Sequence, residues 1–210
     1  MHRDIITIEI ITGLIMEQFK PIEFYNFVDT AYQDEIYKYV TSVDFPWTFM
    51  EDATTEHLNT PEKSTPSFGN LIYWDKNPDH HPHIEMFKPL LATLEEKGNL
   101  KIQELLRMRL GFLMNTKYGL PSMPYKHNTP HRDYEQEHYV AVYYVNKTDG
   151  ETVIFNQTEP SEKYYPMHKC MPEKGKLLLF NGWHYHASTC PKVFTKRIAL
   201  TINFTATKNG

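Results

Sequence analysis

The sequence is poor in cysteine and glycine, and it carries no surplus of positive charge. Its two cysteines are too few for a disulfide framework or a four-thiolate zinc site. A Cys170–Cys190 bridge is one alternative, but two reduced thiols in a cytosolic protein are the expectation. The formal net charge of −4 excludes nucleic-acid binding that depends on the overall charge of the protein, but it is compatible with a local basic groove.

The sequence also has no apolar run long enough to span a bilayer. The longest run, residues 5–16, is interrupted by Glu9 and lacks a small-residue cleavage site. We therefore expect a cytoplasmic protein with no membrane partner. Hydrophobic residues make up 40% of the 210 residues and charged residues 23%, which excludes disorder as the main state and predicts a single domain.

Two helices are predicted in the first half of the chain. The first covers residues 30–42, where Thr30 and Gln33 have the spacing of a capping box. The second covers residues 84–97 and ends at Gly98. Apolar side chains recur at helical spacing in both segments, so we expect each helix to pack one face against a core.

Strand-like runs dominate after residue 100. They cover residues 105–114, 138–146, 151–156, 175–181 and 193–205. Short strands separated by turn signals favour a sandwich or a jelly roll. Earlier in the chain, alternating isoleucines predict a strand near residues 6–10, and the polar, proline-broken stretch 53–67 predicts a loop. We expect one domain, with an α/β support region over 1–100 and a β half over 101–210.

Histidine is abundant, with 11 residues, and one histidine pattern suits a ferrous iron site. Such sites hold iron with two histidines and one carboxylate on one face. A His-x-Asp pair on a strand places both side chains on the same side. The chain has three pairs of this kind, His2/Asp4, His83/Glu85 and His131/Asp133. The first lies at a terminus and the second abuts a predicted helix, where this spacing separates the side chains. Only the third lies in the β-rich half.

A third ligand should come from a strand that folds back over the first two. His184 and His186 would face the same side of a strand, so strand parity does not choose between them. His186 is followed by Ala187 and Ser188, small residues that leave room near a metal. Further along, Arg197 lies in an apolar strand, where a charge is costly without an anionic partner. A dicarboxylate cosubstrate would supply that partner, because a guanidinium binds a carboxylate through two parallel hydrogen bonds.

Four segments resemble the iron(II)/2-oxoglutarate-dependent dioxygenases, above all the small prolyl-4-hydroxylase-like members, including versions carried by bacterial viruses. The segments are PHRD (130–133), YYVNKTDGETVIF (143–155), KLLLFNGWHYHAS (176–188) and RIALTINF (197–204). The resemblance covers about 125–205, and 107–115 more faintly, while residues 1–100 match only in general character. It implies a mainly β fold with N-terminal helices, in which 101–210 form a double-stranded β-helix, a cupin-like jelly roll with the site in its open mouth.

The resemblance also implies roles for individual residues. His131, Asp133 and His186 would be the iron ligands, and Arg197 would bind the distal carboxylate of 2-oxoglutarate. We count all four as catalytic residues. The implied reaction takes Fe(II), 2-oxoglutarate and O2, releases succinate and CO2, and hydroxylates an unactivated C–H bond. A carboxylate at position 133 favours hydroxylation over halogenation, which needs that ligand position open for halide.

The chain departs from the family pattern around the cosubstrate. Asp149 replaces the first glycine of the family's Gly-Gly-x-Thr turn, and Ala199 stands where many members carry Ser or Thr. The carboxylate of the cosubstrate would then have one hydroxyl donor fewer than in those members, unless the hydroxyl of Thr201 or of a tyrosine replaces it. Tyr125 and Tyr144 are both candidates for binding 2-oxoglutarate, and the sequence does not rank them. The prime substrate is open as well, with a peptidyl proline favoured over other protein side chains, small metabolites and nucleic-acid bases.

Several other residues near these segments have two interpretations. Arg107 and Arg109 alternate on a predicted strand, so both side chains would point to the same face. They could line the mouth of the barrel and contact an anionic substrate, but we expect them to lie at a solvated edge. His127 and His138 are expected to be ordinary strand-edge histidines, with a role behind the metal ligands as the alternative. The histidine-rich stretch 79–83 is expected to be a solvated loop.

Other reaction classes lack the motifs that they need. The HRD at 131–133 occurs in kinase catalytic loops, but His138 stands where an asparagine is required and no Gly-rich phosphate loop exists. HExxH and GxSxG are both missing, which excludes zinc proteases and serine hydrolases of those types. Two alternatives to an oxygenase stay open. One is a non-catalytic jelly-roll binding or structural protein, and the other is a cupin-like enzyme that holds a metal without 2-oxoglutarate.

Overall fold

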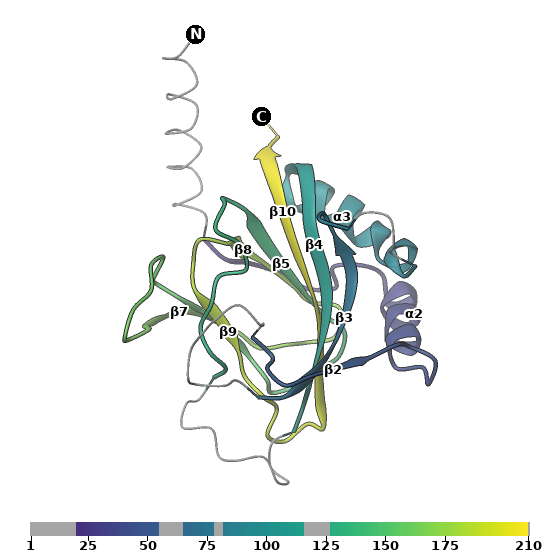
Figure 1. The fold of residues 1–210 in the computed structure, drawn as a ribbon. Helices are drawn as coiled ribbons and strands as arrows, with labels where there is room; N and C mark the ends of the chain where they lie inside the picture. The colour runs from purple at the N-terminus through teal and green to yellow at the C-terminus, as the bar shows by residue number, and fades with distance from the viewer. Residues whose placement is uncertain (1–19, 55–64, 78–81, 116–126, 210) are drawn as a thin grey trace.

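A computed structural model of the chain describes residues 20–54, 65–77, 82–115 and 127–209. The predicted strand near residues 6–10 and Tyr125 lie outside the described residues, and so does most of the predicted loop 53–67. The described chain is mostly β-structure. Two sheets face each other, and the helices cover the outer face of the larger sheet (Figure 1).

The larger sheet has seven antiparallel strands. In the order in which they pair, they are β1 (Ile22–Phe24), β8 (Leu177–Asn181), β5 (Tyr139–Tyr144), β10 (Lys196–Lys208), β4 (Leu100–Met114), β3 (Ser67–Trp74) and β2 (Thr48–Met50). The smaller sheet consists of β7 (Pro166–Cys170), β6 (Thr152–Phe155) and β9 (His186–Ser188), again in pairing order. From β5 onward the chain passes repeatedly between the two sheets, as it does in a jelly roll.

The strands predicted after residue 100 correspond to β4, β5, β6, β8 and β10, and five further strands were not predicted. β1, β2 and β9 have three residues each, which is too short for an alternating pattern to be recognised. β3 contains Gly69 and Asn70, and both residue types are depleted in strands. Because β1, β2 and β3 join the larger sheet, the first hundred residues contribute directly to the β-structure.

The first helix, α2 (Thr30–Val40), begins one residue after its cap. The cap is Asp29, whose carboxylate accepts a hydrogen bond of 2.9 Å from the backbone N–H of Tyr32. The predicted capping box of Thr30 and Gln33 is therefore wrong. Gln33 lies on the buried face of the helix, and its side-chain amide donates to the carbonyl of Val28 at 2.8 Å instead of bonding to the N–H of Thr30.

The segment predicted as a second helix is divided into a short 3-10 helix, η1 (Ile84–Met86), and α3 (Lys88–Gly98). Pro89 lies in the first turn of α3, where its missing N–H has no helical partner to lose. Gly98 is the last helical residue, and Asn99 caps the helix in a left-handed conformation with φ 50°. Asparagine tolerates this conformation better than most residues.

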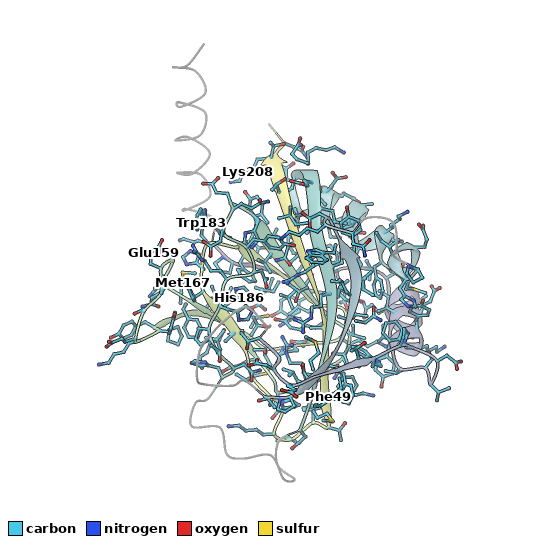
Figure 2. All side chains as sticks on the ribbon, in the orientation of Figure 1. Phe49, Glu159, Met167, Trp183, His186 and Lys208 are labelled. Carbon is cyan, nitrogen blue, oxygen red and sulfur yellow. The ribbon has the colours of Figure 1, made fainter. Side chains whose placement is uncertain are left out.

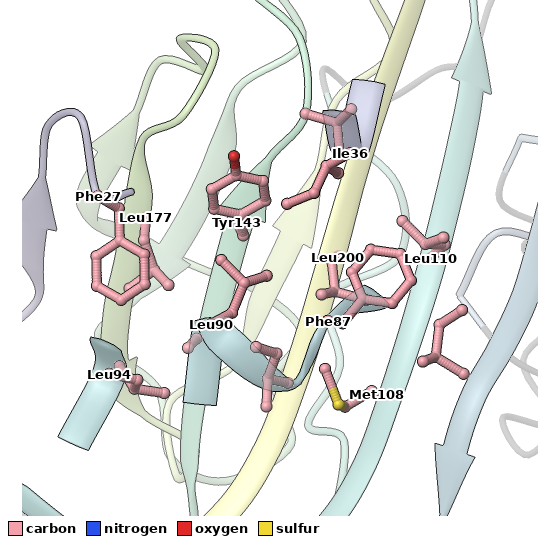
Figure 3. Close-up of a cluster of buried hydrophobic side chains, with 14 of the residues drawn as sticks. Phe27, Ile36, Phe87, Leu90, Leu94, Met108, Leu110, Tyr143, Leu177 and Leu200 are labelled. Carbon is pink, nitrogen blue, oxygen red and sulfur yellow. The ribbon is translucent and has the colours of Figure 1, made fainter. Parts of the chain in front are cut away.

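The largest hydrophobic core lies between the two helices and the outer face of the larger sheet (Figure 3). Leu90 and Leu94 of α3 and Ile36 of α2 are fully buried against it, together with Tyr143 of β5. Tyr144, the next residue, points the other way into a second buried cluster between the sheets. The two tyrosines therefore face opposite sides, as alternation along a strand predicts.

Candidate metal centre

Three potential metal ligands meet in the space between the two sheets. Each of His131, Asp133 and His186 offers one ligand atom, and these three atoms all lie within 4.8 Å of one another. Nε2 of His131 is 3.8 Å from Oδ1 of Asp133, and Nε2 of His186 is 3.5 Å from Oδ2. Figure 2 shows His186 among the side chains between the sheets. The His-x-Asp pair and a distant histidine thus converge on one point.

Backbone hydrogen bonds fix the two histidine segments against each other. The N–H of His131 donates to the carbonyl of His186 at 3.0 Å, and the N–H of His186 donates back at 2.9 Å. β9 also pairs with β6, which places His186 opposite Ile154. His184 precedes this strand, and its Nδ1 donates to the carbonyl of Phe155 at 3.0 Å. The pairing decides between the two histidines, since only His186 reaches the cluster.

The ring orientation of both clustered histidines is set by backbone carbonyls. Nδ1 of His131 donates to the carbonyl of Thr129 at 3.0 Å, and Nδ1 of His186 donates to the carbonyl of His184 at 3.2 Å. Because Nδ1 then carries the proton, Nε2 presents its lone pair toward the centre of the cluster. This tautomer is the one that a metal ligand needs.

The carboxylate of Asp133 is held by two side chains from the larger sheet. Arg107 of β4 donates to Oδ1 at 2.5 Å, and the amide of Asn203 on β10 donates to Oδ2 at 2.8 Å. Arg107 and Asn203 lie opposite each other in the strand register and are themselves joined by a hydrogen bond of 3.1 Å. The three side chains form a closed network that fixes the plane of the carboxylate.

The surroundings set the charge state of the cluster. Burial alone would raise the pKa of Asp133, but the charge of Arg107 and the neighbouring His186 hold that pKa well below its usual range. Burial lowers the pKa of His131 to about 4, and the adjacent His186 contributes in the same direction. At neutral pH, Asp133 is therefore an anion and His131 a neutral imidazole, which are the protonation states of metal ligands.

Arg197 lies at the start of β10 and is almost fully buried. Its Nε donates to the carbonyl of Gly150 at 2.9 Å, and one Nη donates to the hydroxyl of Thr152, also at 2.9 Å. The guanidinium carbon lies 5.6 Å from the ring centre of Tyr144, whose hydroxyl donates to Thr152 at 2.7 Å. No carboxylate is paired with Arg197 among the described residues. Burial lowers the pKa of Arg197, but a guanidinium stays charged in proteins. A buried charge of this kind is costly unless an anion pairs with it.

The turn before β6 is shaped around this arginine. A Cβ added to Gly150 would come within 2.7 Å of the carbonyl oxygen of Thr189 and 2.9 Å of Cδ of Arg197. The preceding residue, Asp149, accepts hydrogen bonds from backbone N–H groups of the loop that leads into β10, among them that of Lys192 at 3.0 Å. Asp149 therefore contributes to the turn by fixing the chain that carries Arg197.

One cavity connects the ligand cluster to Arg197. Its walls combine side chains of the inner faces of both sheets, including Arg107, Arg109, His131, Asp133, Val142, Thr152, His186, Ser188, Arg197, Ala199 and Thr201. Its volume is about 90 Å³. Alternate residues of β10 contribute to one wall, as a strand that faces the cavity should. Thr201 lies in this wall, whereas Tyr144 is buried behind Arg197.

The predicted solvated edge at Arg107 and Arg109 is wrong, because β3 pairs with β4 and encloses both side chains. The side chain of Arg107 is only 13% exposed. His138 also differs from the expected strand-edge histidine. It is buried, and its ring lies so close to Gly182 that a Cβ there would be 2.2 Å from Nε2.

Other expectations concern residues outside the cavity. His127 packs its ring against Phe155 at 5.1 Å and does not belong to the ligand cluster. Of the histidine-rich stretch 79–83, the described part includes His83, which shares a hydrogen bond of 2.7 Å with the hydroxyl of Tyr39. Cys170 and Cys190 are both free thiols, in agreement with the expected reduced state.

Comparison with solved structures identifies the fold. The structure is similar to a 2OG-Fe(II) oxygenase-family oxidoreductase from Burkholderia pseudomallei, with a TM-score of 0.62 and 14% identity over 88% of this chain and 85% of that one. A prolyl-4-hydroxylase from Pseudomonas putida gives 0.56 and 13% over 93% and 96%. A prolyl hydroxylase from Trichoplax adhaerens, in complex with a hypoxia-inducible-factor peptide fragment, gives 0.58 and 15% over 88% and 82%. The chain therefore has the jelly-roll fold of the 2-oxoglutarate–Fe(II) oxygenases.

Comparison with known sequences found no relative, in contrast to the comparison of structures. No family model and no curated protein sequence matches this chain. Within the described residues, none of the helices has the length and apolar character that crossing a membrane requires. At 13–15% identity, the similarity to these solved structures shows the fold alone.

Proposed function

We propose that this protein is an Fe(II)- and 2-oxoglutarate-dependent dioxygenase that hydroxylates an unactivated C–H bond and releases succinate and CO2. One observation carries the proposal. A two-histidine, one-carboxylate cluster and a buried arginine without a carboxylate partner among the described residues share a single cavity. The fold of the similar oxygenases supports the same reaction class.

The chemistry of the donor set fits ferrous iron. His131, Asp133 and His186 would hold it, and two imidazole nitrogens with one carboxylate on one face are typical of non-haem Fe(II) oxygenases. Their Nε2 lone pairs and carboxylate are already oriented by Thr129, the 184 carbonyl and the Arg107–Asn203 pair. Ferrous iron held by these residues would supply the activation of O2 that the proposed reaction needs.

The other end of the cavity suits the cosubstrate. Arg197 would bind the distal carboxylate of 2-oxoglutarate, because its remaining N–H groups face no carboxylate among the described residues and a guanidinium binds carboxylates bidentately. Thr152 and Tyr144 hold the guanidinium in place from behind. The hydroxyl of Thr201, on the same strand face as Ala199, is available to the cosubstrate. Tyr144 thus assists through Arg197 rather than by lining the cavity.

The proposal extends to the class of the prime substrate. A peptidyl proline is favoured because the similar structures include prolyl hydroxylases, one of them in complex with a peptide fragment. Other protein side chains, small metabolites and nucleic-acid bases come after it. Hydroxylation is preferred to halogenation because Asp133 occupies a ligand position as a carboxylate held on both oxygens.

The test begins without oxygen. Purified protein mixed with Fe(II) and 2-oxoglutarate should develop the weak visible charge-transfer band of the chelate, and O2 should then yield succinate. His131→Ala, Asp133→Ala and His186→Ala should abolish both signals, whereas His184→Ala is the matched control and should keep them. Absence of the band together with absence of iron-dependent thermal stabilisation would favour a non-catalytic jelly-roll protein. Metal binding that Arg197→Ala leaves unchanged, with no response to 2-oxoglutarate in either protein, would favour the cupin-like alternative.

A further inference from the structure

Ser67 is a buried polar residue that the proposed function does not use. It is the first residue of β3, it is 2% exposed, and it lines the cavity that also contains the metal ligands and Arg197. Its hydroxyl has no hydrogen-bond partner among the described residues. Buried hydroxyls in folded proteins are almost always hydrogen-bonded, so an unpartnered one at a cavity wall indicates that a bound molecule supplies the partner.

The strand register places Ser67 at the Arg197 end of this cavity. β3 and β10 lie on either side of β4, and both run antiparallel to it. Phe68, the next residue of β3, pairs with Phe112 of β4. Ser67 is therefore level with Leu113, the residue of β4 that pairs with Arg197. Ser67 and Arg197 thus belong to one row across the larger sheet, and both line the cavity.

The opposite wall closes around the same end of the cavity. The hydroxyl of Thr152 on β6 accepts a hydrogen bond of 2.9 Å from Arg197, and Thr152 pairs with Ser188 of β9. The side-chain amide of Asn128 donates to the hydroxyl of Ser188 at 3.0 Å, and its oxygen accepts from the backbone N–H of Thr65 at 3.1 Å. Since Thr65 leads into β3, these contacts form a ring that starts at Arg197, crosses the smaller sheet and returns to the first residue of β3.

This ring encloses a positive charge that needs an anion. No carboxylate pairs with Arg197 among the described residues. The carboxylate that lines the cavity belongs to Asp133, and Arg107 and Asn203 hold it further along β4 and β10. A carboxylate of a bound molecule could accept hydrogen bonds from a guanidinium and from a hydroxyl at the same time, because it has two oxygens and several lone pairs.

The neighbouring row of the sheet leaves room for such a group. Ala199 of β10 and Gly111 of β4 pair with each other, and both line the cavity. A Cβ added to Gly111 would meet no atom within 4 Å. Neither residue has a polar side-chain atom, so Ser67 supplies the hydroxyl at this end of the larger sheet.

We propose that Ser67 is a binding residue for 2-oxoglutarate and that its hydroxyl donates to the distal carboxylate that Arg197 binds. The guanidinium donates from the β10 side of the ring and the hydroxyl from the β3 side. The carboxylate gives the hydroxyl of Ser67 the partner that it lacks, and a hydrogen bond to a charged group is stronger than one between neutral groups. This inference rests on the proposed function, since it adds a contact to the same cosubstrate.

The experiment compares two 2-oxo acids that differ only in the distal group. 2-Oxopentanoate has the chain length of 2-oxoglutarate but ends in a methyl group. Each acid is titrated by calorimetry, without O2, into full-length protein loaded with Mn(II). Ser67→Ala should weaken the binding of 2-oxoglutarate about tenfold and leave that of 2-oxopentanoate at the wild-type value, since only the first has the carboxylate. Ser161→Ala, at an exposed serine, is the matched control and should bind both acids as the wild type does.

A second variant moves the hydroxyl to another strand. When Ala199→Ser is added to Ser67→Ala, the new hydroxyl lies two residues from Arg197 on the same face of β10. It should restore most of the lost affinity for 2-oxoglutarate, which would show that the loss came from a missing donor and not from altered packing. The inference is overturned if Ser67→Ala binds 2-oxoglutarate as tightly as the wild type, or if both acids lose affinity equally.

The same titrations separate this inference from the proposed function. If the wild-type protein binds no 2-oxoglutarate, the proposed function fails and the contact from Ser67 fails with it. If Arg197→Lys weakens the binding of 2-oxoglutarate but Ser67→Ala does not, only the contact from Ser67 is overturned. The affinity of Ser67→Ala for Mn(II), measured without 2-oxoglutarate, should equal that of the wild type, which shows that the variant folds with its metal centre intact.

Discussion

The guanidinium of Arg107 lies 2.5 Å from Oδ1 of Asp133, and this ion pair is set into the wall of the cavity rather than exposed at its rim. Only 7% of the Asp133 side chain is exposed. A buried carboxylate needs a partner for each oxygen, and Asn203 supplies the second. The arrangement fixes one orientation of the carboxylate before any metal binds.

This arrangement predicts that Asn203 supports metal affinity without contacting the metal. Replacing Asn203 by alanine should weaken binding of Mn(II) or Fe(II) about 10- to 100-fold, as is typical when a partner of a ligand is lost. Metal titration of the purified protein measures it. Thr205→Ala, two residues further along β10, is the matched control and should bind metal normally. Equal affinities of Asn203→Ala and wild type would show that Arg107 alone orients the carboxylate.

Arg197 should be irreplaceable even by lysine. An ammonium keeps the charge but cannot reproduce the fork that bonds Gly150, Thr152 and a carboxylate together. We expect Arg197→Lys to raise the Kd for 2-oxoglutarate about 10- to 100-fold, since a hydrogen bond between charged groups contributes ~1.5–3 kcal/mol. Equilibrium dialysis with Mn(II) present measures it. Metal affinity measured without 2-oxoglutarate should stay at the wild-type value, and a parallel loss of both would indicate misfolding instead.

Gly150, in the turn beside Arg197, and Gly111, in the wall of the cavity, should respond differently to alanine. At Gly150 the new methyl would press on the Thr189 carbonyl and the Arg197 side chain, so we expect a loss of about 1–3 kcal/mol in the free energy of unfolding. At Gly111 the methyl meets nothing within 4 Å, so the change should stay within about 0.5 kcal/mol. Urea unfolding of both variants tests this pair. A stable Gly150→Ala protein would mean that the turn can move aside.

Asp149 should make stability depend on pH in the acid range. Burial alone would raise the pKa of Asp149, but the backbone N–H groups of Lys192, Phe194 and Val193 donate to its carboxylate and bring the pKa below the usual 3.8. A pKa that is lower in the folded state stabilises the protein above the unfolded pKa of about 4, and this contribution disappears as the pH falls through the folded value.

Thermal melts of wild type and Asp149→Asn between about pH 7 and pH 2 test this dependence. The difference in Tm should be largest at neutral pH and should shrink as the acid form of the wild-type carboxyl accumulates. Asp44→Asn, which changes an exposed aspartate in the turn between α2 and β2, is the control. A constant difference between Asp149→Asn and wild type across this range would contradict the prediction.

Parts of the site could be predicted from the sequence because they depend on local spacing. The His131-x-Asp133 pair follows from alternation along a chain segment, and Arg197 is conspicuous as a charge within an apolar run. Spacing alone left His184 and His186 equivalent. The decision came from a long-range backbone bridge between residues 131 and 186, which no local pattern contains.

The residues that were missed depend on strand register. Asn203 becomes a partner of Asp133 only because β10 and β4 place it opposite Arg107. Ser67 lies within a stretch that reads as a polar loop, and it reaches the cavity only because β3 pairs with β4. Alternation along β10 from Arg197 onward could have suggested Asn203, since residues two apart share a face. Pairing between distant strands could not have been predicted from one sequence.

The pairing of β1 with β8 has a practical consequence. β1 lies at the edge of the larger sheet, and Glu23 at its centre binds Lys176 at 3.0 Å next to β8. A shortened protein that begins after Phe24 would leave the backbone groups of Leu177–Leu179 unpaired along one side. It would also remove one of the two carboxylates that pair with the buried ammonium of Lys176. Such truncations invite strand-to-strand oligomers, so expression designs should retain the residues around Ile22.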